Sequence, residues 1–125
     1  MSNNSFPKNV RLLKRAQFLE LSKKGQKIHT GFFIVVVLEG KTQNNRIGIT
    51  ASKKIGNAVK RNRIKRLIRE SFRLRRENLS GNKDINIIVR KTLTTLSNKQ
   101  IIEKLDKLFT KIALANNEEA TIKFY

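Results

Sequence analysis

Residues 46–73 read RIGITASKKIGNAVKRNRIKRLIRESFR. At the start, residues 46–52 alternate apolar with small or polar side chains, which is the pattern of a strand with one buried face. From residue 57 to about residue 76 the apolar residues recur at helical spacing. Ile64, Leu67 and Ile68 cluster on one side of the helix, together with the small residue Ser71. The stretch therefore predicts a strand, a short connection and a long helix whose apolar side packs on a sheet.

The opposite side of this helix is cationic. It carries Asn62, Lys65, Arg66, Arg69, Arg73 and Arg76, with Arg61 and Arg63 on the flanks. Between residues 53 and 76, eleven lysines and arginines accompany a single acid, Glu70. Solvated helix faces usually mix both signs of charge, and like charges four residues apart destabilise a helix by about 0.2–0.5 kcal/mol. The stripe therefore predicts an external anion, and the arginine fork suits phosphate.

The composition of the whole chain indicates the same kind of partner. Its 125 residues carry a formal net charge of +19, a self-repulsion that nucleic acid would screen. A hydrophobic content of 38% supports one modest core, so we expect a single domain over residues 1–125. Residues 1–9 are expected to be an extended segment, and residues 116–125 a tail that either frays, as a flexible end would, or docks back. The absence of cysteine and of an apolar run near the roughly 20 residues of a membrane span favours the cytoplasm.

The remaining segments predict further helices and strands. A short helix is expected over Arg15–Lys24, ended by Gly25 in a left-handed cap. Strands are expected over Phe32–Leu38 and Asp84–Arg90, with room for another short strand near residues 27–30. The last helix follows the capping box Ser97–Gln100. Its expected apolar face consists of Ile101, Ile102, Leu105, Leu108, Phe109 and Ile112. This order predicts an α+β sandwich of a small sheet and helices.

Residues 46–73 resemble the signature of the bacterial ribonuclease P protein subunit, with Arg61-Asn62-Arg63 as the most specific part. The likeness extends over about residues 10–112 and includes Phe18 and Gly25 in the first helix. The family fold implied is an αβββαβα chain with a small, mainly antiparallel sheet, like the second domain of ribosomal protein S5. Its strand–helix–strand crossover would be left-handed, against the usual preference.

The resemblance implies an RNA-binding subunit of a ribonucleoprotein enzyme. Its partners would be the ribonuclease P catalytic RNA and precursor tRNA, whose 5′ leader the holoenzyme removes endonucleolytically. The active site is expected in the RNA, with Mg²⁺ serving the RNA-catalysed reaction and no cofactor or metal bound by the protein alone. Neither a further protein partner nor a membrane is implied.

Two sets of site residues follow from the resemblance. Those expected to contact the catalytic RNA are Lys53, Lys54, Asn57, Arg61, Asn62, Arg63, Lys65, Arg66, Arg69 and Arg73. Those expected in the leader cleft are Arg11, Phe18, Ser22, Phe32, Val36, Thr50 and Arg90. Relatives often carry aromatic residues at the positions of Ser22 and Val36, so leader stacking is expected to be weaker here. By strand alternation Phe32 is expected on the face of Val36. There its ring either stacks on the leader or belongs to the core, and the same two interpretations apply to Phe18.

Catalysis by the protein itself is not expected. Its nine acids are scattered, whereas two-metal nucleases need clustered carboxylates, and His29 is the single histidine. The alternative function is a general structured-RNA or ribosome-associated binding protein without a processing role, which the charge stripe fits equally well. A membrane-surface helix fits poorly because the sheet requires the apolar side.

Overall fold

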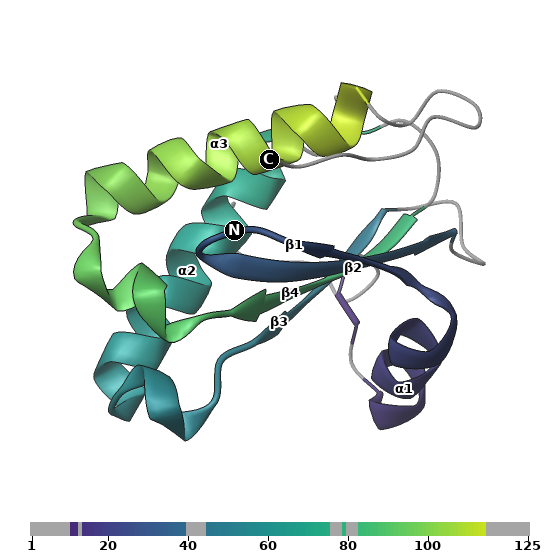
Figure 1. Cartoon of the computed structure of the whole chain (residues 1–125), viewed down its shortest axis with the longest axis horizontal. Coiled ribbons are helices and arrows are strands. Elements are labelled where there is room, and N and C mark those ends of the chain that lie inside the picture. Colours follow the sequence, from purple (N-terminus) through teal and green to yellow (C-terminus); the bar gives the residue numbers. More distant parts are fainter. Residues whose placement is uncertain (1–10, 13, 40–44, 76–78, 80–82, 115–125) are drawn as a thin grey trace, which may run out of the picture.

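The chain folds around a four-stranded sheet, shown in the computed structural model of Figure 1. The structure describes residues 11–12, 14–39, 45–75, 79 and 83–114. In chain order the elements are α1 (Arg15–Lys24), β1 (Gln26–His29), β2 (Phe33–Glu39), β3 (Arg46–Thr50), the 3₁₀ helix η2 (Lys53–Ile55), α2 (Ala58–Arg75), β4 (Lys83–Val89), the 3₁₀ helix η4 (Lys91–Thr95) and α3 (Asn98–Leu114). The predicted αβββαβα order is confirmed. The expectations for residues 1–9, 116–125 and Arg76 lie outside the described residues, and the single-domain boundary stays a prediction.

The strands lie in the order β1, β2, β4, β3. Two of the pairings, β1 with β2 and β2 with β4, are antiparallel, whereas β3 and β4 run parallel. The sheet is therefore mixed and mainly antiparallel, as the resemblance implied. Helix α2 connects the parallel pair, and the left hand expected of this crossover stays a prediction.

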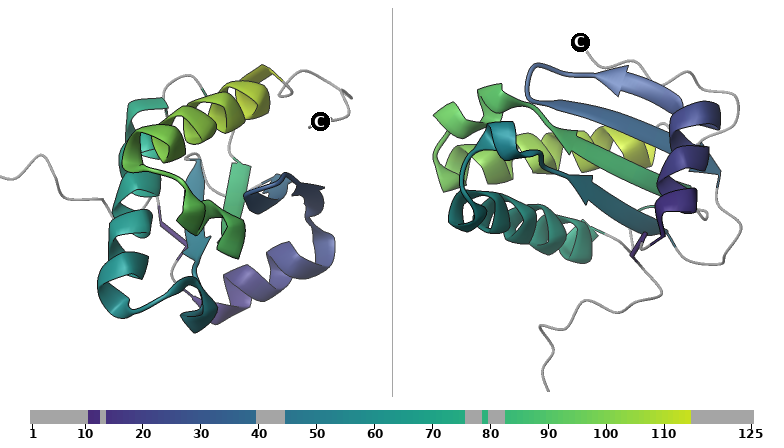
Figure 2. Two further views of the ribbon diagram at one scale, coloured as in Figure 1. Left: turned by 60° about the vertical axis from the view of Figure 1, so that its left-hand side comes forward. Right: turned by 90° about the horizontal axis from the view of Figure 1, so that it is seen from below.

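Helices cover both faces of the sheet (Figure 2). On one face α2 and α3 enclose the main core, in which the rings of Phe72 and Phe109 lie 5.9 Å apart between centroids. The predicted apolar side of α2 is confirmed, with Ile64, Ile68 and Ser71 buried and Leu67 partly buried. On the other face α1 packs over a smaller cluster. Its buried members are Leu12, Leu21 and Val36.

Gly25 ends α1, but the predicted left-handed cap is wrong. Its backbone is extended, with φ −75° and ψ 156°, and its N–H donates to the carbonyl of Leu21. A Cβ at this position would lie 2.6 Å from both the Leu21 oxygen and Val36 Cγ1. Glycine is needed for the close approach of the helix end to β2 rather than for a positive φ.

A turn at Thr30 sets the start of β2. The Thr30 hydroxyl oxygen accepts hydrogen bonds from the N–H groups of Phe32 and Phe33, at 3.3 and 2.9 Å. This turn keeps Phe32 out of the strand, which begins at Phe33 instead of the predicted Phe32. Because strand alternation therefore does not apply to Phe32, its predicted position on the face of Val36 is wrong.

The predicted start of α3 is confirmed in atomic detail. Ser97 Oγ accepts from the N–H of Gln100 at 3.2 Å, and the Ser97 N–H donates to Gln100 Oε1 at 2.9 Å. The predicted apolar residues of α3 are buried except Ile102, which is 39% exposed. That one assignment is wrong: helical spacing puts Ile102 on the side of Phe109, yet at this end of the helix the neighbouring elements do not cover it.

Candidate nucleic-acid interface

The start of α2 is fixed by a cap and a glycine. Asn57 Oδ1 accepts a hydrogen bond from the N–H of Lys60 at 2.9 Å, which satisfies one free donor of the first turn. Gly56 before it has φ 147°, a backbone conformation that other residues rarely adopt. Since α2 begins at a defined point, its charged side chains have a defined direction relative to the sheet.

The predicted stripe on α2 faces solvent. Seven of the ten residues expected to contact RNA are exposed, namely Lys53, Lys54, Asn57, Asn62, Arg66, Arg69 and Arg73. The other three, Arg61, Arg63 and Lys65, are half-buried. The structure thus brings the α2 members of the set onto the surface opposite the buried Ile64 and Ile68, with two lysines preceding them in η2.

Few of these charges are neutralised by the described residues. Among the described residues, Arg73 is the one member of the set that forms an ion pair, 2.5 Å from Glu70 on the same helix. Arg75 lies outside the set and ties α2 to α3, where it contacts Asp106 at 3.4 Å and Thr110 at 3.5 Å. Most of the stripe therefore remains available to an external anion.

Arg61 and Arg63 are held by packing. The Nε atom of each is covered by protein and has no hydrogen-bond partner in the described part of the chain. The residues as a whole are only half-buried, so other parts of each side chain remain exposed. Partly immobilised arginine forks lose less conformational entropy when they bind phosphate.

A hollow of about 260 Å³ lies beside the helix start. It is lined by Gly56, Asn57, Val59, Lys60 and Arg63. Lys60 and Val59 were not among the predicted site residues. Lys60 could have been identified from its position three residues after Asn57, in the same first turn of the helix.

The α1 face of the sheet holds the second predicted site. Phe18 is half-buried and packs over β3 so closely that a Cβ on Gly48 would lie 2.4 Å from its Cε1. Thr50, two residues beyond Gly48 on the same face, is exposed and donates to Asn86 Oδ1 at 3.2 Å. These contacts bring Phe18 and Thr50 onto one surface at the edge of α1.

The other residues predicted for this cleft are distributed less simply. Ser22 is exposed on α1, and Arg11 pairs with Ile47 in a parallel bridge. Val36 is 2% exposed beneath α1, so its predicted place on the cleft surface is wrong. Phe32 packs against the core on the α2 and α3 face, so its assignment to the leader cleft is wrong as well.

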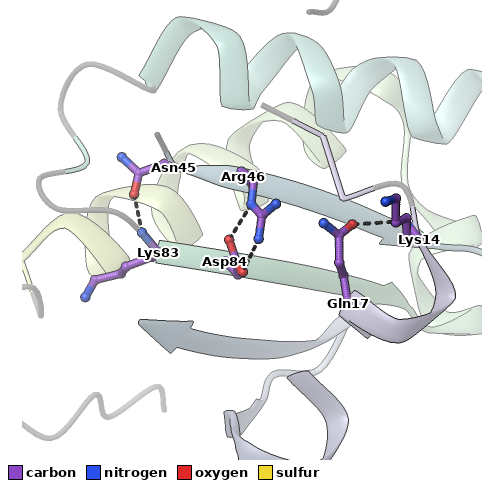
Figure 3. Close-up of polar contacts among 6 residues, drawn as sticks. All are labelled: Lys14, Gln17, Asn45, Arg46, Lys83 and Asp84. Carbon is purple, nitrogen blue, oxygen red and sulfur yellow. Dashed lines mark hydrogen bonds and ion pairs between the residues drawn. The ribbon is translucent and has the colours of Figure 1, made fainter. Parts of the chain in front are cut away.

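A two-pronged ion pair joins β3 to β4 on the same face (Figure 3). Arg46 Nε donates to Asp84 Oδ1 at 2.8 Å, and Nη2 donates to Oδ2 at 2.7 Å. The hydrogen bond to Asp84 raises the pKa of Arg46, and burial acts in the opposite direction. This arginine is thus engaged internally and is not part of the exposed stripe.

Comparison with known proteins agrees with this geometry. The family model described as Ribonuclease P matches residues 6–113. This chain belongs to the ribonuclease P protein family. A ribonuclease P protein component of Desulforapulum autotrophicum is 53% identical over 112 residues, covering 90% of this chain and 96% of the relative.

Solved ribonuclease P proteins share the fold. The structure from Staphylococcus aureus has a TM-score of 0.78 at 38% identity, covering 86% of this chain and 98% of that one. The structure from Thermotoga maritima has a TM-score of 0.74 at 32% identity, covering 82% of this chain and 96% of that one. As a ribonuclease P protein, the chain is a subunit of a holoenzyme for tRNA 5′ processing whose RNA carries the catalysis.

Two kinds of feature are absent from the described residues of this ribonuclease P protein. In the part of the chain that the structure describes, no three His, Asp or Glu side chains gather where they could hold a metal ion. Nor is any helix in the described ranges long and apolar enough to cross a membrane. What the described surface does offer is the cationic side of α2 and the edge of the α1 face.

Two polar clusters in this ribonuclease P protein were missed by sequence analysis. Asn45 is buried, its amide donating to the Leu79 carbonyl at 2.7 Å and its Oδ1 accepting from the Lys83 N–H at 2.8 Å. The Arg46–Asp84 pair was likewise not predicted. Their partners lie 34 to 38 residues away, and no local pattern marks such contacts.

Proposed function

We propose that the exposed residues of α2 and η2 bind the catalytic RNA of ribonuclease P, and that the α1 edge of the sheet binds the 5′ leader of precursor tRNA. The observation that carries the first part is the exposed stripe itself. It faces away from a well-packed core, and within the described residues only Arg73 among its members is paired with an acid.

The physical role of the stripe is to neutralise phosphate. Two large RNAs repel each other, and cations placed between them lower that repulsion by releasing condensed counterions. Arginine also fixes orientation because its fork can grip two phosphate oxygens. The protein therefore improves assembly while the RNA performs the reaction, and the Mg²⁺ that this reaction is expected to require is assigned to the RNA. We place this activity in the cytoplasm.

The leader site in this proposal is built on Phe18 and Thr50. An exposed part of an aromatic ring can stack on an unpaired base, and a hydroxyl can bond to a base edge or sugar. Arg90, exposed at the end of β4, would contact the backbone of the leader. Because Val36 is buried and Phe32 lies on the other face, Phe18 is the one ring of the predicted cleft set that supports this role.

The stripe is tested by the salt dependence of RNA binding. Arg66→Gln combined with Arg69→Gln removes two exposed charges that lack an ion pair among the described residues. The slope of log affinity against log salt should become shallower by about 0.7–0.9 for each phosphate that the variant no longer neutralises. The measurement is titration of the cognate RNA with protein over a salt series, with circular dichroism as the check on folding.

A matched control removes two charges elsewhere. Lys23→Gln combined with Lys99→Gln changes exposed lysines on α1 and α3 and should leave the slope close to that of the unmodified protein. Equal slopes for the two double variants would contradict the assignment of α2. Equal affinity for the cognate RNA and an unrelated structured RNA would support the alternative of a general RNA-binding protein, which the family relationship does not favour.

A further inference from the structure

A second cationic hollow lies between the β1–β2 turn and α3, the helix that lies above the hairpin in Figure 1. Its volume is about 250 Å³. The lining residues are Thr30, Gly31, Phe32 and Phe33 from the turn and Lys104, Lys107, Leu108 and Lys111 from α3. None of the lysines belongs to the stripe on α2.

The hollow and the stripe lie on different sides of α3. Arg75 of α2 contacts Asp106 and Thr110, so these two residues mark the side of α3 that faces α2. At about 100° per residue, the three lysines of the hollow fall within about 60° of one another and at least about 100° from Asp106, whereas Thr110 lies about 60° from the nearest of them. Within the described residues, no acid forms an ion pair with Lys104 or Lys107.

The hollow also has an aromatic wall. Phe32 is half-buried against the core, and Lys104 Nζ lies 5.4 Å from the centre of its ring. The position of the Lys104 ammonium group shows that the Phe32 ring is accessible from the side of the hollow that α3 forms. Lysine over phenylalanine is a modest interaction, so an incoming group can displace the ammonium.

The turn that carries Phe32 is held from several sides. Arg90 Nη1 donates to the Thr30 carbonyl at 3.2 Å, and the Thr92 hydroxyl donates to the Gly31 carbonyl at 2.5 Å. A Cβ built on Gly31 would meet nothing within 4 Å, so the approach to the turn is open. The backbone that carries the ring is therefore held in place, and the space beside Gly31 is open, which lowers the ordering cost of binding.

A flat aromatic wall beside clustered ammonium groups fits a ligand that is both aromatic and anionic. Pockets for drug-sized ligands usually have about 300–1,000 Å³, so the smaller volume here leaves room for no more than one nucleotide. Sites for single-stranded nucleic acid combine the same two features, a stacking ring and a cationic track.

We propose that this hollow binds one unpaired nucleotide of an RNA strand, with the base against Phe32 and the phosphate beside Lys104 and Lys107. The inference rests on the proposed function, because it takes the bound macromolecule to be an RNA of the ribonuclease P complex. Two sources have the required chemistry: the upstream part of a long 5′ leader, and an unpaired segment of the catalytic RNA. The protein would then contact RNA at two places, at the stripe on α2 and at the hollow beside α3.

The test uses the assembled holoenzyme and two variants of the hollow. Phe32→Leu keeps an apolar side chain for the core but removes the stacking ring, and stacking is worth about 1–3 kcal/mol per base. This predicts that the affinity falls by about fivefold or more. Lys104→Gln combined with Lys107→Gln removes the cations that would bind phosphate, and its matched control is the Lys23→Gln and Lys99→Gln double variant. Thermal unfolding of each free protein separates an effect on binding from an effect on folding.

The readouts are the affinity for the catalytic RNA and the affinity of the holoenzyme for precursor tRNAs with short and long leaders. Weaker binding confined to long leaders supports the proposal and assigns the hollow to the leader. Weaker assembly that is independent of leader length supports it and assigns the hollow to the catalytic RNA. Affinities equal to those of the control double variant in every arm overturn it. The Arg66 and Arg69 variant reports separately on the stripe, so failure at the hollow is distinguishable from failure of the proposed function.

Discussion

Two ion pairs in this protein differ in geometry and in surroundings: Arg46 and Asp84 form two hydrogen bonds, whereas Arg73 and Glu70 form one. The side chains of Arg46 and Asp84 are 14% and 9% exposed, whereas those of Arg73 and Glu70 are 39% and 50% exposed. Water and salt screen the second pair, so its contribution to stability is expected to be small. The first pair links adjacent strands and leaves a covered carboxylate behind if it is broken.

Replacing Arg46 should therefore be costly. We expect Arg46→Ala to lower the free energy of unfolding by about 2–4 kcal/mol, because Asp84 would remain buried without either hydrogen bond. Arg73→Ala should change it by less than about 1 kcal/mol. Urea unfolding of the free protein measures both values. Similar changes in the two variants would show that burial does not distinguish the pairs.

Gly48 allows α1 to approach the sheet. A Cβ there would lie 2.4 Å from Phe18 Cε1 and 3.2 Å from Leu12 Cβ. We expect Gly48→Ala to destabilise the protein by about 1–3 kcal/mol, in the range of overpacked cores, and adding Phe18→Leu should recover part of this stability by vacating the space. Gly31→Ala is the control, since a Cβ there meets nothing within 4 Å. Thermal unfolding of the variants makes the comparison, and a fully stable Gly48→Ala protein would be inconsistent with the packing.

At the scale of elements, α2 depends on the rest of the fold more than most helices do. Its row of like charges opposes helix formation, while its buried face and its cap favour it. Asn57 has two roles: it caps α2, and it is one of the residues expected to contact RNA.

Substitutions at Asn57 should separate these roles. Asn57→Ala removes the cap and should reduce stability by about 1 kcal/mol. Asn57→Asp keeps a cap acceptor and adds a favourable charge at the helix N-terminus, so stability should be retained while RNA affinity falls from repulsion of phosphate. Ser97→Ala, which removes the cap of α3, should cost similar stability without weakening RNA binding. The measurements are thermal unfolding and RNA titration, and if Asn57→Asp bound RNA as tightly as the unmodified protein, Asn57 would have only the structural role.

At the scale of the whole molecule, the net charge of +19 makes stability and binding respond oppositely to salt. Added salt screens self-repulsion in the free protein and should raise its melting temperature. The same salt weakens RNA binding: for six to ten phosphate contacts, affinity falls by about 10³–10⁵ between about 50 and 200 mM. Calorimetry and RNA titration in one salt series test both trends. A melting temperature independent of salt would show that the charges are too dispersed for repulsion to matter.

The sequence by itself determined most of the elements, the apolar side of α2, the capping box of α3 and the direction of the cationic stripe, whereas the full αβββαβα order was implied by the family resemblance. Each of these depends on residues within a few positions of one another, so periodicity and cap chemistry are sufficient to predict them. The family motif added the identity of the bound RNA.

Only the tertiary structure decided where Phe32 points, that Val36 is covered, why Gly25 and Gly48 must be small, and that Arg46 is paired with Asp84. It alone placed Lys104 and Lys107 beside the β1–β2 turn. These outcomes depend on contacts between residues far apart in the chain, or on a turn that shifts the alternation of a strand by one position. Such a shift moves a side chain to the other face of a sheet, and no local pattern in the sequence records it.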